Sequence, residues 1–294
     1  MKFLLAISSS QYSAPTLKLG AEIARVFGAE LNIVYVGPKT NSFQEGPLDL
    51  ARTSLSQWNI HHPGVEVLEW AFEEIKKIYP ENDDLKQVQF EPRNIVEEGN
   101  RFKVILPAIG GCDIQLTLRE GELITELRDE LQLDKYALTI IGGSKGKRKM
   151  AHDLIQYLPS SVLIVRNLDL KKRYKLLLLV DDSALTEKSI RFGVDIAKTE
   201  KWDIRTLTVS KNERFGPGYK GAAENAKAYI EKQGLKVEQF FLTGDPVTTF
   251  VEFAGDDHIM IMGESTANPL LKLFKGSKPI KTLEQSTAPI LIIK

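Results

Sequence analysis

The chain has 294 residues, of which 43% are hydrophobic and 27% are charged, and its formal net charge at neutral pH is zero. This composition is typical of a soluble globular protein, and the balanced charge argues against the basic surface that nucleic-acid binding requires. The single cysteine, Cys112, excludes a disulfide framework, and no apolar run reaches the roughly 20 residues that span a bilayer. We therefore expect a cytoplasmic protein with neither a membrane nor a nucleic-acid partner.

The first segment of the chain is repeated in its second half. Residues 2–36 align without a gap to residues 175–209, with eight identical positions, Gly20/Gly193 among them, and mostly conservative replacements at the others. A duplicated chain of this length predicts two domains, which we place at 1–167 and 174–294. The short charged segment Asn167–Arg173 is the expected linker between them.

Each repeat begins with a predicted strand, a helix and a second strand. The runs Phe3–Ile7 and Leu176–Val180 are entirely apolar, as expected for strands that helices cover on both faces of a parallel sheet. An amphipathic helix follows each run, and Ser183 or Thr186 is the expected cap of the second helix. The second strands of these βαβ units are predicted at Leu31–Val36 and Ile204–Val209.

The first repeat then departs from the second. A helix is predicted at Val65–Ile78, and a segment with no counterpart in the second repeat is inserted near 80–111. Within this insertion, Val88–Phe90 and Lys103–Leu106 are predicted strands, which would form a small hairpin or flap. The regular pattern resumes with predicted strands at Ile114–Leu118 and Leu138–Ile141.

The second repeat continues regularly to its end. Its predicted helices and strands alternate, at Ala222–Gln233, Val237–Leu242, Val247–Ala254, His258–Met262, Pro279–Gln285 and Ile290–Ile293. The expected fold class is therefore α/β, with two tandem doubly wound, mostly parallel five-stranded sheets. The last strands of the repeats, Val162–Val165 and Ile290–Ile293, are apolar edges, which we expect to pair within the chain as a pseudo-dimer. A homodimer is the alternative use of these edges.

Residues suited to ligand binding follow the predicted strands of the second repeat. Asp181 follows its first strand, Gly263 follows its fourth strand, and Gly276 and Ser277 precede its last helix. Ligands of open parallel sheets bind at the carboxyl ends of the strands, where glycine lets the backbone approach a phosphate and a helix start offers free N–H groups. Each of these residues alone is also common in ordinary turns, so the prediction depends on their combination.

This combination resembles the tandem universal stress proteins, whose fold is similar to that of the adenine nucleotide α-hydrolases. The nucleotide loop of that family has the pattern Gly-x2-Gly-x9-Gly-(Ser/Thr). Gly263, Thr266, Gly276 and Ser277 stand at these spacings, with Thr266 in place of a glycine.

The resemblance implies an ATP or ADP site in the second repeat, with or without magnesium. It implies that Asp181 contacts the base or ribose, that Val209 lines the adenine pocket, and that the loop residues hold the phosphates. The side chain of Thr266 is expected to narrow the phosphate pocket.

The first repeat lacks the same features. Ser8 stands at the position of Asp181, and Gln156 stands where the later glycine of the loop is expected. The segment Gly142–Lys149 is rich in glycine and lysine, and we interpret it as a solvated basic turn, with a different anion site as the alternative. It is not a Walker loop, because the required glycine and hydroxyl positions are filled by Ile141 and Arg148.

Three functions stand as hypotheses. The leading one is a nucleotide-binding regulatory protein of the stress response, with one competent site in the second repeat. The second is an enzyme that slowly hydrolyses ATP or transfers a phosphoryl or adenylyl group, although no general base is evident and no catalytic residue is assigned. The third is a scaffold or small-ligand binder that uses the first repeat. No metal site is assigned in any of the three.

Overall fold

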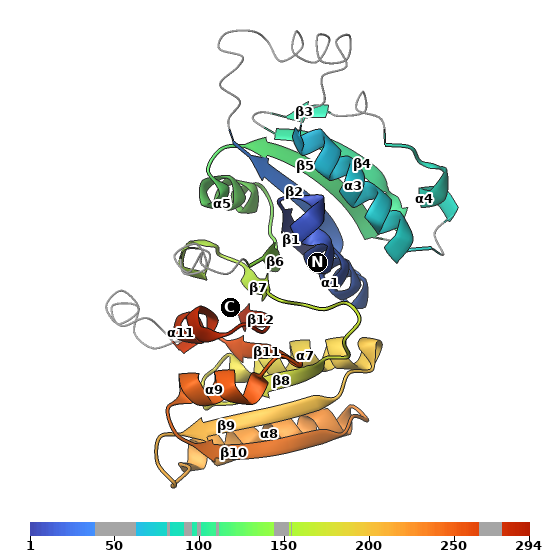
Figure 1. Ribbon diagram of the computed structural model, residues 1–294. Helices are drawn as coiled ribbons and strands as arrows, with labels where there is room; N and C mark the ends of the chain where they lie inside the picture. The colour runs from blue at the N-terminus through green and yellow to red at the C-terminus, as the bar shows by residue number, and fades with distance from the viewer. Residues whose placement is uncertain are drawn as a thin grey trace, which may run out of the picture. The chain divides into compact units, whose positions relative to one another are not determined.

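The computed structural model describes residues 1–38, 63–80, 83–90, 96–98, 101–109, 112–143, 153, 155–264 and 278–294. The chain forms two compact units, Met1–Ile140 and Ile141–Lys294 (Figure 1). Within the described residues, no helix is both long and apolar enough to cross a membrane.

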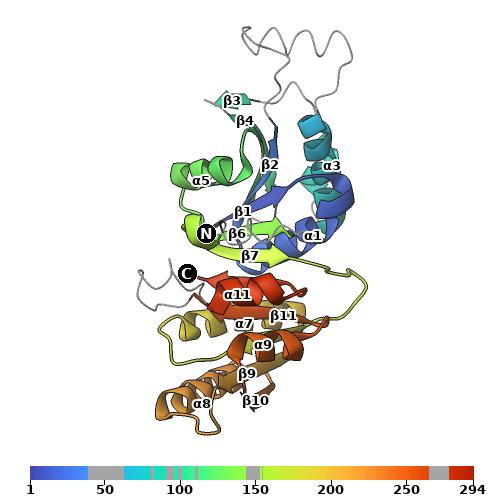
Figure 2. The ribbon, with the colours of Figure 1, turned by 60° about the vertical axis from the view of Figure 1, so that its left-hand side comes forward.

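The first unit is a mixed sheet with helices on both faces. Its strands are β1 (Lys2–Ile7), β2 (Glu30–Gly37), β3 (Val96–Glu98), β4 (Arg101–Ile109), β5 (Cys112–Glu120) and β6 (Leu138–Gly142), in the order β6-β1-β2-β5-β4-β3. Its helices are α1 (Ser10–Val26), α3 (Pro63–Ile78), α4 (Asp83–Gln87) and α5 (Leu123–Leu133). Strands β1, β2 and β5 are parallel, and Figure 2 shows α5 on the opposite side of this sheet from α1 and α3.

The insertion of the first repeat extends this sheet at one edge. Strand β4 is antiparallel to β5, and β3 is antiparallel to β4, so a hairpin does form, with the predicted strand Lys103–Leu106 inside β4. The predicted strand Val88–Phe90 is wrong, because these residues follow α4 as irregular chain. Phe90 instead packs its ring against Phe72 of α3, with the ring centroids 5.9 Å apart. An aromatic residue of high strand propensity is thus used for packing on a helix.

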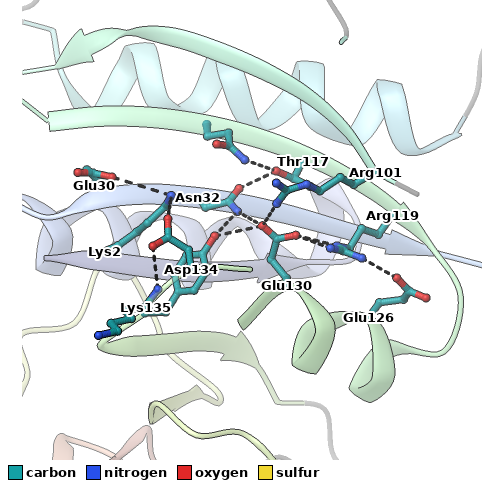
Figure 3. Close-up of polar contacts among 12 residues, drawn as sticks. Lys2, Glu30, Asn32, Arg101, Thr117, Arg119, Glu126, Glu130, Asp134 and Lys135 are labelled. Carbon is teal, nitrogen blue, oxygen red and sulfur yellow. Dashed lines mark hydrogen bonds and ion pairs between the residues drawn. The ribbon is translucent and has the colours of Figure 1, made fainter. Parts of the chain in front are cut away.

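A buried ionic cluster ties the inserted strand β4 to helix α5. Glu130 of α5 is fully buried and accepts hydrogen bonds from Arg101 Nη1 of β4 at 2.8 Å and from Arg119 Nε of β5 at 2.8 Å. The same carboxylate accepts hydrogen bonds from Asn32 at 3.0 Å and Tyr136 at 3.1 Å (Figure 3). Buried charges of this kind are tolerated only when they are paired and hydrogen-bonded, so the insertion and α5 depend on each other.

The second unit has the doubly wound fold that the sequence predicts. Its elements are β7 (Ser161–Val165), β8 (Lys175–Leu179), α7 (Thr186–Glu200), β9 (Ile204–Ser210), α8 (Pro217–Lys232), β10 (Val237–Thr243), α9 (Pro246–Ala254), β11 (His258–Gly263), α11 (Lys278–Gln285) and β12 (Ile290–Ile293). The strand order is β10-β9-β8-β11-β12-β7, and the strands from β10 to β12 are all parallel to their neighbours. Helices α9 and α11 contact each other in front of this sheet in Figure 1, and α7 and α8 contact each other behind it.

Strand β7 completes this sheet, although it precedes the linker in the sequence. It pairs antiparallel with β12, with Ile164 opposite Ile290 and Val162 opposite Ile292. The two apolar last strands of the repeats are therefore hydrogen-bonded to each other, as expected. This pairing places β7 in the second compact unit, Ile141–Lys294, next to the last strand of the second repeat.

Packing explains why both repeats have a glycine at the same position of their first helix. Gly20 of α1 and Gly193 of α7 occupy equivalent positions, and each faces the leucine of the preceding strand. A Cβ atom added at Gly20 would lie 2.3 Å from Leu5 Cδ1, and one added at Gly193 would lie 2.5 Å from Leu178 Cδ2. Such distances are far below van der Waals contact, so a side chain at either position would force the leucine or the helix to shift.

Candidate functional site

The carboxyl ends of β8 and β11 form the switch point of the second sheet. These strands are paired in parallel, with Leu178 opposite Ile261. From β8 the chain continues to β9 on one side, while from β11 it continues to β12 on the other side. Asp181 follows β8 and Gly263 ends β11, so two of the predicted site residues lie at the edge where open α/β sheets bind ligands.

Asp181 is fixed by the first residues of its own turn. Its Oδ1 atom accepts hydrogen bonds from the backbone N–H of Ser183 at 3.0 Å and from the hydroxyl of Thr186 at 2.8 Å. Its Oδ2 atom lies 3.8 Å from Nζ of Lys278. Burial alone would raise the pKa of Asp181, but the hydrogen bonds from Ser183 and Thr186, with the charge of Lys278, hold that pKa below its usual value. Asp181 is therefore an oriented anion at neutral pH.

Ser183 and Thr186, the predicted caps of α7, donate hydrogen bonds to Asp181 and do not cap the helix. The cap residue of α7 is Leu185, which makes no side-chain hydrogen bond to the helix start. The hydroxyl of Thr186 donates to the Asp181 carboxylate, and the Oγ atom of Ser183 lies 3.2 Å from Thr186 Oγ1. The capping prediction was wrong because the stronger local acceptor, a carboxylate, takes the donors.

A cavity of about 550 Å³ opens beside this turn, between α7 and α8. Asp181, Asp182 and Glu187 contribute carboxylates to its wall. Tyr229 and Asn225 of α8 line it with polar groups, and the remaining lining residues are small, apolar or hydroxyl-bearing: Ser183, Thr186, Ile190, Pro217, Gly218, Gly221, Ala222 and Ala226. This acidic cavity thus combines carboxylate oxygens, which accept hydrogen bonds, with apolar surface.

Helix α8 begins five residues earlier than predicted, and this early start builds the wall of the cavity. The sequence predicts this helix only from Ala222, because the glycines before it are common in turns. Pro217 is instead the first residue of the helix, a position that suits the fixed φ of proline. Gly218 then approaches Asp182 closely, since an added Cβ would lie 3.0 Å from Asp182 Oδ2.

A second, basic cavity of about 360 Å³ is lined by α9, α11 and the residue after β9. Lys211, Lys278 and Lys281 line it together with Asp245, which caps α9. The Asp245 carboxylate accepts a hydrogen bond from the backbone N–H of Thr248 at 3.0 Å. That bond, together with the charge of Lys211, lowers the pKa of Asp245. Lys278 is shared, because it lines this cavity and also faces Asp181.

The other predicted site residues either line neither cavity or lie outside the described residues. Val209 is only 4% exposed, lies opposite Leu242 of β10, and is not one of the residues that line the cavity beside Asp181. Gly263 faces the start of α7, since an added Cβ would lie 2.7 Å from Leu185 Cβ. Its missing side chain is thus explained by packing, and its phosphate contact stays a prediction. The remaining three, Thr266, Gly276 and Ser277, lie outside the described residues.

The corresponding turn of the first unit is built without a carboxylate. Ser8 takes the place of Asp181, and Ser13 takes the place of Thr186. The hydroxyl of Ser13 accepts hydrogen bonds from the backbone N–H groups of Ser8 at 3.0 Å and Ser9 at 3.3 Å. This turn satisfies its own donors and offers a ligand no charge. Most of the basic turn at 142–149 lies outside the described residues.

Within the described residues, no group of three or more histidine, cysteine, aspartate or glutamate side chains is arranged to hold a metal ion. The histidine pair His61-His62 lies outside the described residues.

The chain is similar to universal stress proteins in sequence and in fold. No family model matches the chain. The universal stress protein YxiE of Bacillus subtilis (strain 168) is 23% identical over 146 residues, which cover 41% of this chain and 98% of that protein.

Solved structures of universal stress proteins are similar to the whole chain or to part of it. A putative universal stress protein from Pseudomonas aeruginosa UCBPP-PA14 is 15% identical and covers 100% of this chain and 93% of its own, with a TM-score of 0.63. A universal stress protein from Archaeoglobus fulgidus, solved in complex with dAMP, is 21% identical and covers 41% of this chain and 98% of its own, with a TM-score of 0.34. The resemblance predicted from the sequence is confirmed: the chain is a tandem of two universal stress protein folds.

Proposed function

We propose that the second unit binds an adenine nucleotide, ATP or ADP, at the carboxyl ends of β8 and β11, and that the chain is a nucleotide-binding regulatory protein. The observation that carries this proposal is Asp181. It is a charged, oriented carboxylate at the switch point of the sheet, and it forms part of the wall of a cavity of about 550 Å³. That volume is within the roughly 300–1,000 Å³ of small-molecule sites.

The chemistry of the cavity suits a nucleoside. A carboxylate can accept several hydrogen bonds, and the two donors on Asp181 both use Oδ1. Its Oδ2 atom remains able to accept from ribose hydroxyls or an amino group of the base. Tyr229, Ile190 and Ala226 supply the aromatic and apolar surface on which a planar base packs.

Binding is favoured over catalysis. A hydrolase or transferase needs a positioned base or nucleophile next to the phosphate. The carboxylates of the acidic cavity line the proposed nucleoside end of the site. The basic cavity contains three lysines and Asp245, whose carboxylate is engaged as the cap of α9. In the described part of the chain, no specific observation favours the enzymatic alternative or the scaffold alternative.

Calorimetric titration of the full chain with ATP, ADP and AMP tests the proposal. D181N keeps the shape of the side chain and an acceptor for Thr186, but it removes the charge and turns one acceptor into a donor. We expect D181N to weaken nucleotide binding by about ten-fold or more, the loss typical of a hydrogen bond to a charged group.

The matched control is D256N, which removes an exposed aspartate at the amino end of β11, where Asp256 pairs with Lys172 at 2.8 Å. This variant should bind like the unmodified protein. An absence of nucleotide binding in the unmodified chain, or equal binding by D181N, would overturn the proposal.

A further inference from the structure

Of the three lysines of the basic cavity, Lys278 faces Asp181, but in the described part of the chain Lys211 and Lys281 lack the carboxylate partners that surface lysines of this unit often have. Lys211 and Lys281 form no ion pair with any described residue, whereas Lys172, Lys175 and Lys227 each face a carboxylate. Among the described residues that line the basic cavity, only Asp245 carries a carboxylate, and it is engaged as the cap of α9. The cavity therefore has an excess of positive charge within a small volume.

Two of these lysines stand where a helix disfavours them. Lys278 and Lys281 lie in the first turn of α11, which contains no acidic residue. The amino end of a helix carries partial positive charge, and like charges three residues apart on a helix repel each other. An anion in the cavity would relieve both effects, because it would be attracted by the lysines and by the helix end.

Lys278 connects the basic cavity to the proposed nucleoside site. Its ammonium group lies 3.8 Å from Asp181 Oδ2, while Asp181 lines the acidic cavity and Lys278 lines the basic one. A ligand that places hydroxyl or amino groups on Asp181 therefore has its anionic end directed to the lysines. The two cavities are complementary to the two ends of a nucleotide.

We infer that Lys211, Lys278 and Lys281 bind the outer phosphates of the nucleotide, so that the second unit prefers a triphosphate to a monophosphate. This inference rests on the proposed function and specifies which nucleotides the site takes. The α-phosphate lies nearest the nucleoside, and the further phosphates extend to Lys211 and Lys281. The preference follows because each added phosphate adds negative charge that these lysines attract.

Calorimetric titration of the full chain with adenosine, AMP, ATP and inorganic tripolyphosphate tests this inference. The variant is the double substitution K211A/K281A, which leaves Lys278 and Asp181 in place. The control is K232A/K236A, which removes two exposed lysines of the same unit at the end of α8 and the start of β10. Circular dichroism and thermal unfolding of both variants verify that the fold is retained.

The unmodified chain is expected to bind ATP about 10- to 100-fold more tightly than AMP. K211A/K281A should lose most of this preference and keep its AMP affinity within about two-fold, and K232A/K236A should keep the preference. Equal affinity for ATP and AMP, or an unchanged preference in K211A/K281A, would overturn the inference and leave the proposed function intact. Tripolyphosphate that binds as tightly as ATP would also overturn it, because the ligand would then be a free polyanion. Failure of both AMP and ATP to bind would overturn the proposed function and the inference together.

Discussion

The hydroxyl of Thr186 donates a hydrogen bond to the carboxylate of Asp181 at 2.8 Å. At the equivalent turn of the first unit the direction is reversed, because the hydroxyl of Ser13 accepts hydrogen bonds from backbone N–H groups. The same backbone turn is thus stabilised in two ways, and only the second way leaves a charged oxygen for a ligand. This difference is the reason why we propose the nucleotide site in the second unit and not in the first.

The pKa of Asp181 should lie below the ordinary value of 3.8, and it should rise when Thr186 is replaced by valine. Valine has nearly the same shape as threonine but cannot donate a hydrogen bond, so the charged form of Asp181 loses one of its stabilising contacts. Titration of the carboxyl carbon by NMR measures both values directly. A pKa that T186V leaves unchanged would show that this hydrogen bond does not hold the charge.

The lowered pKa of Asp181 also makes stability depend on pH. A carboxyl group whose pKa is lower in the folded chain stabilises the fold above its unfolded pKa of 3.8, and it loses that contribution as pH falls through the lower, folded value. Urea unfolding should therefore show that the unmodified chain has a higher free energy of unfolding than D181N. This difference should be constant near neutral pH and shrink below about pH 4. A difference that grows on acidification would contradict the sign of the shift.

Replacement of Gly193 by alanine should destabilise the second unit by about 1–3 kcal/mol, the usual effect of overpacking. The added methyl would lie 2.5 Å from Leu178 Cδ2, so the leucine side chain, the helix or the strand must shift. The matched control is G221A in α8, where an added Cβ meets nothing within 4 Å. Alanine is favoured over glycine within a helix by roughly 0.5–1 kcal/mol, so G221A should be neutral or stabilising in urea unfolding. Equal effects of the two substitutions would refute the packing explanation.

Replacement of Glu130 by alanine should destabilise the first unit by about 3–5 kcal/mol, because the buried Arg101 and Arg119 lose their shared carboxylate. Hydrogen-exchange mass spectrometry should show faster exchange in β4 and α5, which this residue connects. The comparison is E73Q on α3, which disrupts an exposed ion pair with Lys76 and should cost less than about 1 kcal/mol. Unchanged exchange in β4 after E130A would mean that the cluster does not hold the insertion in place.

Replacement of Gly263 by alanine separates two roles of that residue. Its Cβ would lie 2.7 Å from Leu185 Cβ and 3.2 Å from the Leu185 carbonyl carbon, so the ligand-free chain should already unfold at a lower temperature. Thermal unfolding without nucleotide is the measurement, with G216A, whose added Cβ meets no atom within 4 Å, as the control. Unchanged thermal stability combined with weakened nucleotide binding would instead support a contact with the phosphates.

The regular part of the fold could be predicted because its signals are local and periodic. In the second repeat, apolar runs and helical spacing gave β12 at its observed bounds and β10, β11, α9 and α11 within one residue. The start of α8 was missed because Gly216 and Gly218 have the composition of a turn, and only the helix start at Pro217 shows how they are used.

The parts that could not be predicted depend on contacts between distant residues. Glu130 pairs with Arg101 across 29 positions, and no pattern within α5 or within the insertion indicates this partner. In the candidate site, Asp181 was predicted from its place after a strand. Lys211 and Lys281 were not assigned to it, because they are brought to one cavity only by the crossovers of the sheet.

The central claim, that the nucleotide occupies the second unit at Asp181, is tested most directly by mapping amide chemical shifts during titration of the full chain with ATP. The account predicts the largest changes in the turn from Asp181 to Ile190 and along the facing side of α8, with little change in the equivalent turn from Ser8 to Leu17. Saturable changes confined to the first unit, or none in the turn after β8, would contradict it.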